Sequence, residues 1–198
     1  MSAVKIRDVA LSHFANYGYE GASLSEIAKE AGIKKPTIYS HYKGKDDLFL
    51  TVVRYVFDVE RRRILVYFQT SKHKSMKAKL KGFFDFIEEG FNQSNTVKFL
   101  LRMCFFPPWN LKFEVAKIVN AFIEGMQRLL KKLMQNHQES GELNGVDIHN
   151  ASLAYITLID GVVIELLFTG KNKYFERVNA SFPIYWQGIT SIEKEKER

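Results

Sequence analysis

A run of basic and aromatic residues near the N-terminus has the side chains best suited to hold an anion. Four lysines and no acidic residue occupy its polar and aromatic positions, which are Lys34, Lys35, Thr37, Tyr39, His41, Lys43 and Lys45. Pro36 is typical of the first turn of a helix, where the backbone already carries partial positive charge. An isolated helix would favour an anionic side chain at that end. The two lysines before the proline therefore indicate that an anion, such as a phosphate group, is supplied by a partner.

Two short helices joined by a tight turn are predicted to position these residues. The first runs from Leu24 to Ala31, with Ser23 as its N-cap and Glu26 at the capping-box spacing. Gly32 suits the turn because glycine accepts a positive φ. Pro36 then opens the second helix as its first residue.

The apolar residues of this unit have the spacing of a helix-turn-helix. Ala28 is small enough for two helices to cross closely, Gly32 follows four positions later, and Ile38 lies six positions beyond. A preceding amphipathic helix, which ends at Gly18, offers a surface for the pair to pack on. In such a unit, residues at the start of the second helix reach base edges in the major groove of DNA. The alternative interpretation is an ordinary solvated basic face.

The segment GYEGASLSEIAKEAGIKKPTIYSHYKGKDDLF resembles the DNA-binding domain of the TetR family of bacterial transcriptional repressors. The likeness covers roughly residues 3–50. By matching position it implies base contacts from Ser25, Lys35, Pro36 and Tyr39, and phosphate contacts from Thr37, Tyr39, His41 and Lys45. Lys34, for its charge and position, and Ser23 complete the predicted DNA-binding set. Many family members have Thr where this chain has Ala22, which puts one phosphate contact in doubt.

The rest of the chain predicts an all-α fold with about nine helices, because apolar residues recur at three- and four-residue spacing between few prolines. Beyond the helix-turn-helix, helices are expected at about 46–69, 76–91, 95–106, 111–137, 148–168 and 174–192. We place a three-helix DNA-binding domain at 1–47. The resemblance implies that the larger helical part, 48–198, binds an effector and dimerises.

An apolar pocket is favoured by the high aromatic content, 14% of residues including 16 Phe. Trp109 is its first candidate, because it follows Pro107 and Pro108 at a break between helices. The full predicted effector-binding set is Phe86, Met103, Phe106, Trp109, Phe113, Phe122, Met126 and Tyr155. Each of these residues also fits ordinary core packing.

Dimerisation is expected through the last two helices, which in the resembled family form a four-helix bundle across a two-fold axis. The predicted interface residues are Leu158, Gly161, Val162, Glu165, Tyr185 and Ile189. A two-fold protein would read a palindrome, since one small helix-turn-helix reads few bases. The alternative is a buried core helix of a monomer. Glu165 could pair with a cationic ligand or with a neighbouring Lys or Arg, and we favour the neighbour.

Composition excludes several other classes of protein. The net charge of +7 and pI near 9.3 favour an anionic partner. Cys104 is the single cysteine, which rules out an internal disulfide and a Cys-rich zinc site. We find no Gly-rich phosphate loop, His-Glu metal helix or nucleophile elbow, so no enzyme, metal or cofactor is expected. Without a signal peptide or a spanning run of about 18 apolar residues, a cytoplasmic protein with no membrane contact is expected.

The function expected from these observations is sequence-specific DNA binding by a homodimeric repressor. An apolar or aromatic small-molecule effector would release it from a palindromic operator on double-stranded DNA. The alternative is a helical protein–protein interaction adaptor with a basic N-terminal module and no effector. Substituting Lys35 and Tyr39 separates the two, because only the first predicts a loss of operator binding.

Overall fold

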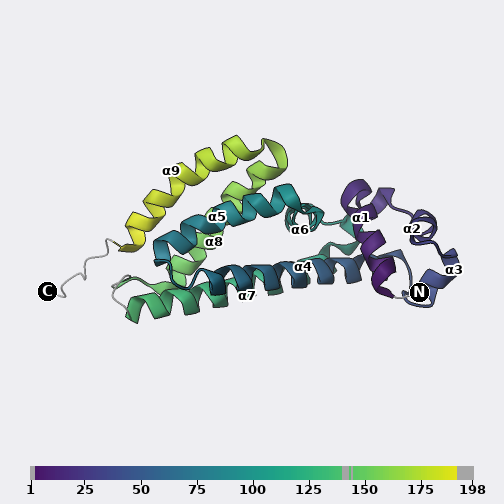
Figure 1. The fold of residues 1–198 in the computed structure, drawn as a ribbon, viewed down its shortest axis with the longest axis horizontal. Helices are drawn as coiled ribbons and strands as arrows, with labels where there is room; N and C mark the ends of the chain where they lie inside the picture. The colour runs from purple at the N-terminus through teal and green to yellow at the C-terminus, as the bar shows by residue number, and fades with distance from the viewer. Residues whose placement is uncertain (1–2, 140–142, 144, 191–198) are drawn as a thin grey trace. The chain divides into compact units, whose positions relative to one another are not determined.

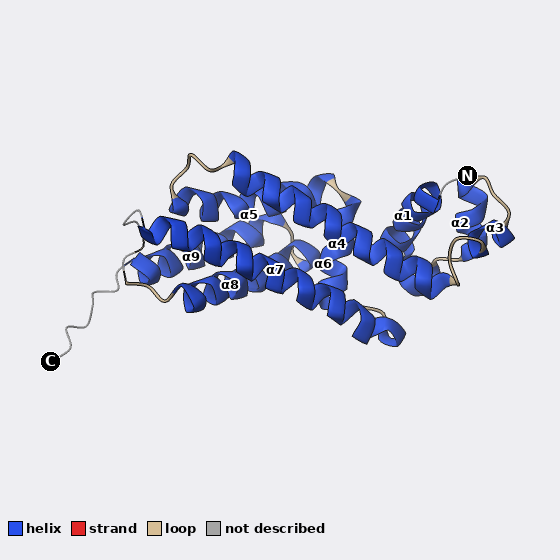
Figure 2. Cartoon of the chain, turned by 90° about the horizontal axis from the view of Figure 1, so that it is seen from below, coloured by secondary structure: helices blue, strands red, loops and turns tan. Residues whose placement is uncertain are grey.

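The computed structural model of the chain describes residues 3–139, 143 and 145–190, which fold into helices joined by short connections (Figure 1). The α-helices in chain order are α1 Ala3–Gly21, α2 Leu24–Ala31, α3 Lys35–Tyr39, α4 Lys45–Thr70, α5 Met76–Gln93, α6 Asn95–Phe105, α7 Lys112–Glu139, α8 Ile148–Phe168 and α9 Lys171–Thr190. The described residues contain no strand (Figure 2). The predicted all-α fold is confirmed.

Helix ends fall where the sequence supplies local caps. Ser23 Oγ accepts a backbone N–H of the first turn of α2, and Asp147 does the same for α8, so both helices begin where predicted. Gly18 has a φ of 69° and interrupts α1, which continues to Gly21 beyond this kink. Gly32 has a φ of 72° and ends α2 in the left-handed conformation that glycine tolerates best.

Replacing Gly32 by alanine is expected to lower the free energy of unfolding by about 1–2 kcal/mol, because a Cβ disfavours the left-handed backbone. The measurement is urea unfolding followed by circular dichroism at fixed protein concentration. Gly44→Ala is the matched control: it lies in the same region, lacks a positive φ, and an added Cβ there meets nothing within 4 Å. Equal losses for both variants would contradict the conformational argument at position 32.

Two connections differ from the sequence prediction. A 3₁₀ turn, Trp109–Leu111, precedes α7, because Pro107 and Pro108 delay the start of the regular helix. Helix α9 begins at Lys171 rather than 174, directly after Gly170, whose φ of 89° lets the chain turn sharply after α8. Pro183 lies within α9, and the predicted end of that helix at 192 falls outside the described residues.

The chain divides into two compact units, which are described separately. The first comprises Met1–Ile64 and Gln93–Phe122, and the second comprises Leu65–Asn92 and Ile123–Arg198. Helix α4 continues unbroken through position 47, where the functional boundary was expected. The functional division into 1–47 and 48–198 therefore stays a prediction.

The first unit has an aromatic core that joins α1, α4 and α6. The rings of Phe14 and Phe49 meet edge to face with centroids 4.9 Å apart, and Phe99 lies 5.9 Å from Phe49. All three side chains are buried. An Arg102 guanidinium N–H also donates to the Ala15 carbonyl at 3.2 Å. These contacts hold α1 in place against α4 and α6.

The second unit packs α5 against α8 and α9 around buried tyrosines. The Tyr155 hydroxyl donates to the Leu80 carbonyl at 2.6 Å, and the Tyr174 hydroxyl donates to the Phe84 carbonyl at 2.9 Å. Both hydroxyls are thus satisfied inside the core, as buried polar groups require. Burial also raises the pKa of Tyr155 well above its usual value, so this residue stays neutral.

Helix α8 is more apolar than its own unit requires. It alone among the described helices is long and apolar enough to cross a membrane by length and composition, although the core helix of a soluble protein passes the same test. No such segment was predicted from the sequence, and Asp160 and Glu165 do interrupt the apolar run of this helix. Only 39% of the stretch is buried. Apolar surface on α8 is therefore open to a further contact.

Candidate nucleic-acid interface

The helix-turn-helix is held together from its apolar side. Ile27, Ala28 and Ile38 are each almost fully buried between α2 and α3. The turn is closed by the Gly32 N–H, which donates to the Lys29 carbonyl at 3.1 Å, and by the following N–H, which donates to the Ala28 carbonyl at 2.9 Å. These bonds satisfy the last carbonyls of α2. The turn and the buried faces together fix how α3 is presented.

The predicted contact residues at the start of α3 are solvent-accessible. Lys34 is the N-cap of α3 and supplies no side-chain hydrogen bond to its end. Lys34, Lys35, Pro36 and His41 are exposed, and Tyr39 is 52% exposed although aromatic residues are more often covered. A cation pair beside an exposed tyrosine is chemically suited to phosphate oxygens and base edges.

Three further members of the predicted set have partners within the chain or lie partly covered. The Ser23 hydroxyl donates to a Glu26 carboxylate oxygen at 3.1 Å while it caps α2. Lys45 Nζ donates to the Glu20 carbonyl at 3.3 Å and lies 4.4 Å from the centre of the Tyr19 ring. Thr37 is half-buried. Ser25, the remaining predicted contact, is exposed on the first turn of α2.

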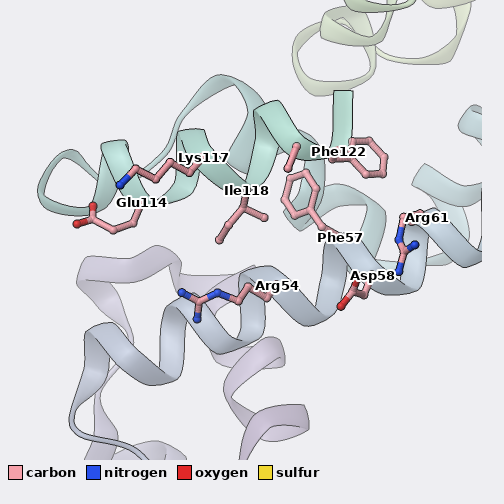
Figure 3. A pocket seen from close by; sticks show the side chains of 9 residues that line it. Arg54, Phe57, Asp58, Arg61, Glu114, Lys117, Ile118 and Phe122 are labelled. Carbon is pink, nitrogen blue, oxygen red and sulfur yellow. Dashed lines mark hydrogen bonds and ion pairs between the residues drawn. The ribbon is translucent and has the colours of Figure 1, made fainter. Parts of the chain in front are cut away.

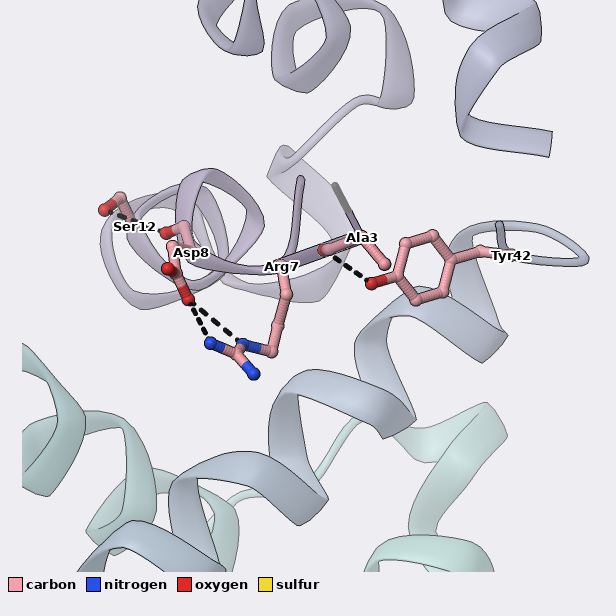
Figure 4. Close-up of polar contacts among 5 residues, drawn as sticks. All are labelled: Ala3, Arg7, Asp8, Ser12 and Tyr42. Carbon is pink, nitrogen blue, oxygen red and sulfur yellow. Dashed lines mark hydrogen bonds and ion pairs between the residues drawn. The ribbon is translucent and has the colours of Figure 1, made fainter. Parts of the chain in front are cut away.

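Two residues that support this unit were missed in the sequence. The Tyr42 hydroxyl donates to the Ala3 carbonyl at 2.9 Å and so ties the segment after α3 to the start of α1 (Figure 4). The Arg7 guanidinium donates to Asp8 at 2.7 Å and lies 3.4 Å from the centre of the Tyr55 ring. Tyr42 is far from Ala3 in sequence, as Arg7 is from Tyr55, so spacing alone gave no signal for these two contacts.

The eight residues predicted to line an effector pocket fall in both compact units. Phe106, Trp109 and Phe113 are exposed, with Trp109 at 81%, and Lys112 Nζ lies 3.6 Å from the centre of the Trp109 ring. Met103 is buried, while Phe122 packs edge to face on Phe57. In the second unit lie Phe86, Met126 and the fully buried Tyr155. The pocket assignment stays a prediction.

Some of the predicted dimer residues are already buried or bonded within their own chain, and others lie at its surface. Val162, Glu165 and Ile189 are buried, and the Tyr185 hydroxyl donates to the Ala151 carbonyl at 3.0 Å. The Glu165 carboxylate accepts the Arg177 Nε at 2.8 Å, so it pairs with a neighbouring arginine as favoured from the sequence. Leu158 and Gly161 line a surface groove of about 480 Å³ over α8 and α9.

Residues 6–52 match the family described as bacterial regulatory proteins, tetR family. A stretch of 77 residues is 36% identical to the HTH-type transcriptional activator FasR of Mycolicibacterium smegmatis, covering 38% of this chain and 35% of that protein. A stretch of 83 residues is 34% identical to the biofilm operon icaADBC HTH-type negative transcriptional regulator IcaR of Staphylococcus aureus, covering 42% and 44%. The matched region is thus less than half of either relative.

The fold is similar over nearly the whole chain to a solved structure of the transcriptional regulator FadR from Bacillus subtilis, determined in complex with stearoyl-CoA. The TM-score is 0.69 with 22% sequence identity, and the match covers 97% of this chain and 100% of that one. At this identity the likeness concerns the fold.

An exposed basic helix-turn-helix on an all-α chain is the arrangement of helical DNA-binding proteins. Residues 6–52 carry the N-terminal domain described for the tetR family of bacterial regulatory proteins. The resemblance predicted from the sequence is thereby confirmed for residues 6–52. The relatives of the chain regulate transcription, which supports the expectation that the chain is not an enzyme.

Proposed function

We propose that the chain is a homodimeric repressor that binds a palindromic operator and is released by an apolar or aromatic small molecule. The observation that carries this proposal is the exposed group of Lys34, Lys35 and Tyr39 at the start of α3, above a helix-turn-helix whose apolar side is fully buried. We expect the repressor to act in the cytoplasm, where its DNA lies.

In the proposed complex the side chains on and around α3 divide between phosphates and bases. The residues assigned to base edges are Ser25, Lys35, Pro36 and Tyr39. Thr37, Tyr39 and His41 hold phosphates, with Lys34 adding charge. Lys45 joins them if its ammonium leaves the Glu20 carbonyl, which is a weak and reversible contact at 3.3 Å. Lysine–phosphate contacts release counterions, so affinity should fall steeply as salt rises.

Dimerisation in the proposal uses the uncovered apolar surface of α8 together with α9. Leu158 and Gly161 lie on this surface, and the absence of a Cβ at Gly161 permits close helix approach. To read successive major grooves, the dimer must present two copies of α3 about 34 Å apart, one turn of duplex DNA. This spacing is what makes a palindrome the expected operator.

Leu158→Glu is expected to convert the dimer to a monomer at micromolar concentration, because it would bury a charge from each protomer in an apolar interface. Sedimentation velocity gives the mass, and operator affinity should fall with it. Val66→Glu is the matched control, since Val66 is an exposed aliphatic residue on α4. A Leu158→Glu protein that remains dimeric would remove α8 from the proposed interface.

The effector part of the proposal rests on two observations. The chain is rich in aromatic residues, and the similar fold of FadR from Bacillus subtilis was solved with stearoyl-CoA, a ligand with a long apolar chain. Relatives bear the names of both an activator and a negative regulator, so the direction of the response needs its own measurement. An effector shifts DNA binding only by its different affinity for the two conformations.

The test of the proposed function is selection of binding sites from a pool of random DNA duplexes. A homodimeric repressor should enrich one inverted repeat with half-sites about 10 base pairs apart, or a multiple of that spacing. Addition of an effector that releases the repressor should then dissociate the enriched complex. Failure to enrich any sequence would favour the adaptor alternative, in which the basic module binds a protein.

A further inference from the structure

A groove of about 550 Å³ lies between α4 and α7 within the first compact unit, the unit that also contains the helix-turn-helix (Figure 3). Its volume is within the range of about 300–1,000 Å³ that is usual for small-molecule sites. Of its lining residues only Phe122 was predicted from the sequence to bind a ligand, because the walls of the groove come from helices far apart in the chain. Neither the family match nor the relatives assign a role to it.

The middle of the groove is apolar. Phe57 from α4 and Phe122 from α7 meet edge to face, with ring centroids 5.2 Å apart. Only 4% of Phe57 is exposed, so its ring forms part of the wall rather than a projecting side chain. Ile118 stands beside them and is half-buried (Figure 3). A hydrocarbon chain or ring that binds here would bury its apolar surface away from water, which favours binding.

The rim of the groove is charged, and part of the charge is not neutralised. Arg61 pairs with Asp58 at 3.3 Å. Arg54 on α4 and Lys117 on α7 have no ion-pair partner in the described part of the chain. In the view of Figure 3 these two cations lie toward one end of the groove together with Glu114, and the aromatic rings lie between them and Arg61.

The charge balance selects the kind of ligand. Three cations and two carboxylates, those of Asp58 and Glu114, line the groove and leave one net positive charge. A single carboxylate matches that charge. A ligand with several phosphates would bring its extra negative charges close to the two acidic side chains, and like charges in contact oppose binding.

We propose that this groove binds a free carboxylic acid with a long apolar body. The apolar part lies against Phe57, Ile118 and Phe122, and the carboxylate lies between Arg54 and Lys117. Helix α4 leads directly from the groove to Lys45, at the edge of the proposed DNA-binding surface, so an occupant has a route to the operator contacts. This last step rests on the proposed function, whereas binding of the acid does not.

Binding is tested by isothermal titration calorimetry of the full chain with sodium laurate below its micellar concentration. One laurate is expected per chain. Dodecanol, dodecyltrimethylammonium and lauroyl-CoA share the same tail but lack a matching single negative charge. Each should bind at least about tenfold more weakly, the equivalent of one or two exposed ion pairs lost.

The Arg54→Gln, Lys117→Gln double variant should bind laurate about tenfold more weakly while its thermal melting stays unchanged, because both side chains stand at the rim. Arg128→Gln with Lys132→Gln removes the same two charges farther along α7 and should leave binding unaffected. No laurate binding, equal losses in both variants, or tighter binding of lauroyl-CoA would overturn the site.

The operator complex provides a separate readout. In one outcome, laurate weakens the operator complex of the wild-type chain without weakening that of the Arg54→Gln, Lys117→Gln variant. This result supports the groove as the effector site. Laurate that binds without any change in operator affinity supports the groove as a binding site and contradicts its role as effector. Failure of the groove and failure of the proposed function are thus distinguishable.

Discussion

Replacing Lys35 and Tyr39 together by alanine is expected to weaken specific operator binding by on the order of 100-fold. Each side chain is assigned a base or phosphate contact, and such contacts contribute about 1–3 kcal/mol apiece. Both side chains are exposed, so their loss removes no core packing. Fluorescence anisotropy with the selected inverted repeat measures the change, and thermal melting verifies the fold.

The control for this variant removes the same charge and the same ring elsewhere. Lys72→Ala with Tyr17→Ala serves, because both residues are exposed and lie outside the helix-turn-helix. The control should bind the operator as the wild type does and should remain dimeric. If the Lys35, Tyr39 variant binds the operator with unchanged affinity, the assigned contacts are wrong, whatever the identity of the operator.

Tyr155→Ala is expected to give the largest loss of stability, about 3–5 kcal/mol in the free energy of unfolding, which is the usual effect of deleting a buried aromatic ring. Its ring is fully buried and lies 5.6 Å from the rings of both Phe84 and Tyr185. Tyr155→Phe keeps the ring and removes only the hydroxyl bond to the Leu80 carbonyl, so about 1 kcal/mol is expected.

Urea unfolding at one fixed protein concentration measures both variants, since the stability of a dimer depends on concentration. Tyr39→Ala is the exposed control and should lie within about 0.5 kcal/mol of the wild type. An unfolding midpoint for Tyr155→Ala equal to that of the wild type would show that the packing around Tyr155 contributes little. The Phe variant also tests the predicted pocket, because an effector that needs the Tyr155 hydroxyl would lose affinity there.

The parts of the fold that local chemistry decides could be predicted from the sequence. Helices α2 and α8 start where predicted because Ser23 and Asp147 cap them, and α2 ends at Gly32 because a positive φ is needed there. Helix α9 starts earlier than predicted because the chain turns at Gly170, directly before it. The positive φ of Gly170 that allows this turn is visible only in the structure.

The candidate site was predictable to a lesser degree. The exposed group on α3 could be inferred because Ile38 and Ala28 mark the buried side, which leaves the lysines outside. The aromatic residues gave no such signal, since Trp109 is exposed and Tyr155 is buried although both were predicted to line the effector pocket. The groove between α4 and α7 is lined by Arg54 and Lys117 from distant segments, which spacing along one chain cannot reveal.

The central claim is that the chain binds DNA by sequence, and one ratio of affinities tests it most directly. Anisotropy titrations at about 150 mM salt should compare the selected inverted repeat with a scrambled duplex of the same length and composition. A regulator with the proposed contacts should favour the repeat by about 1,000-fold or more. Equal affinity for the two duplexes would contradict sequence-specific recognition by the residues of α3.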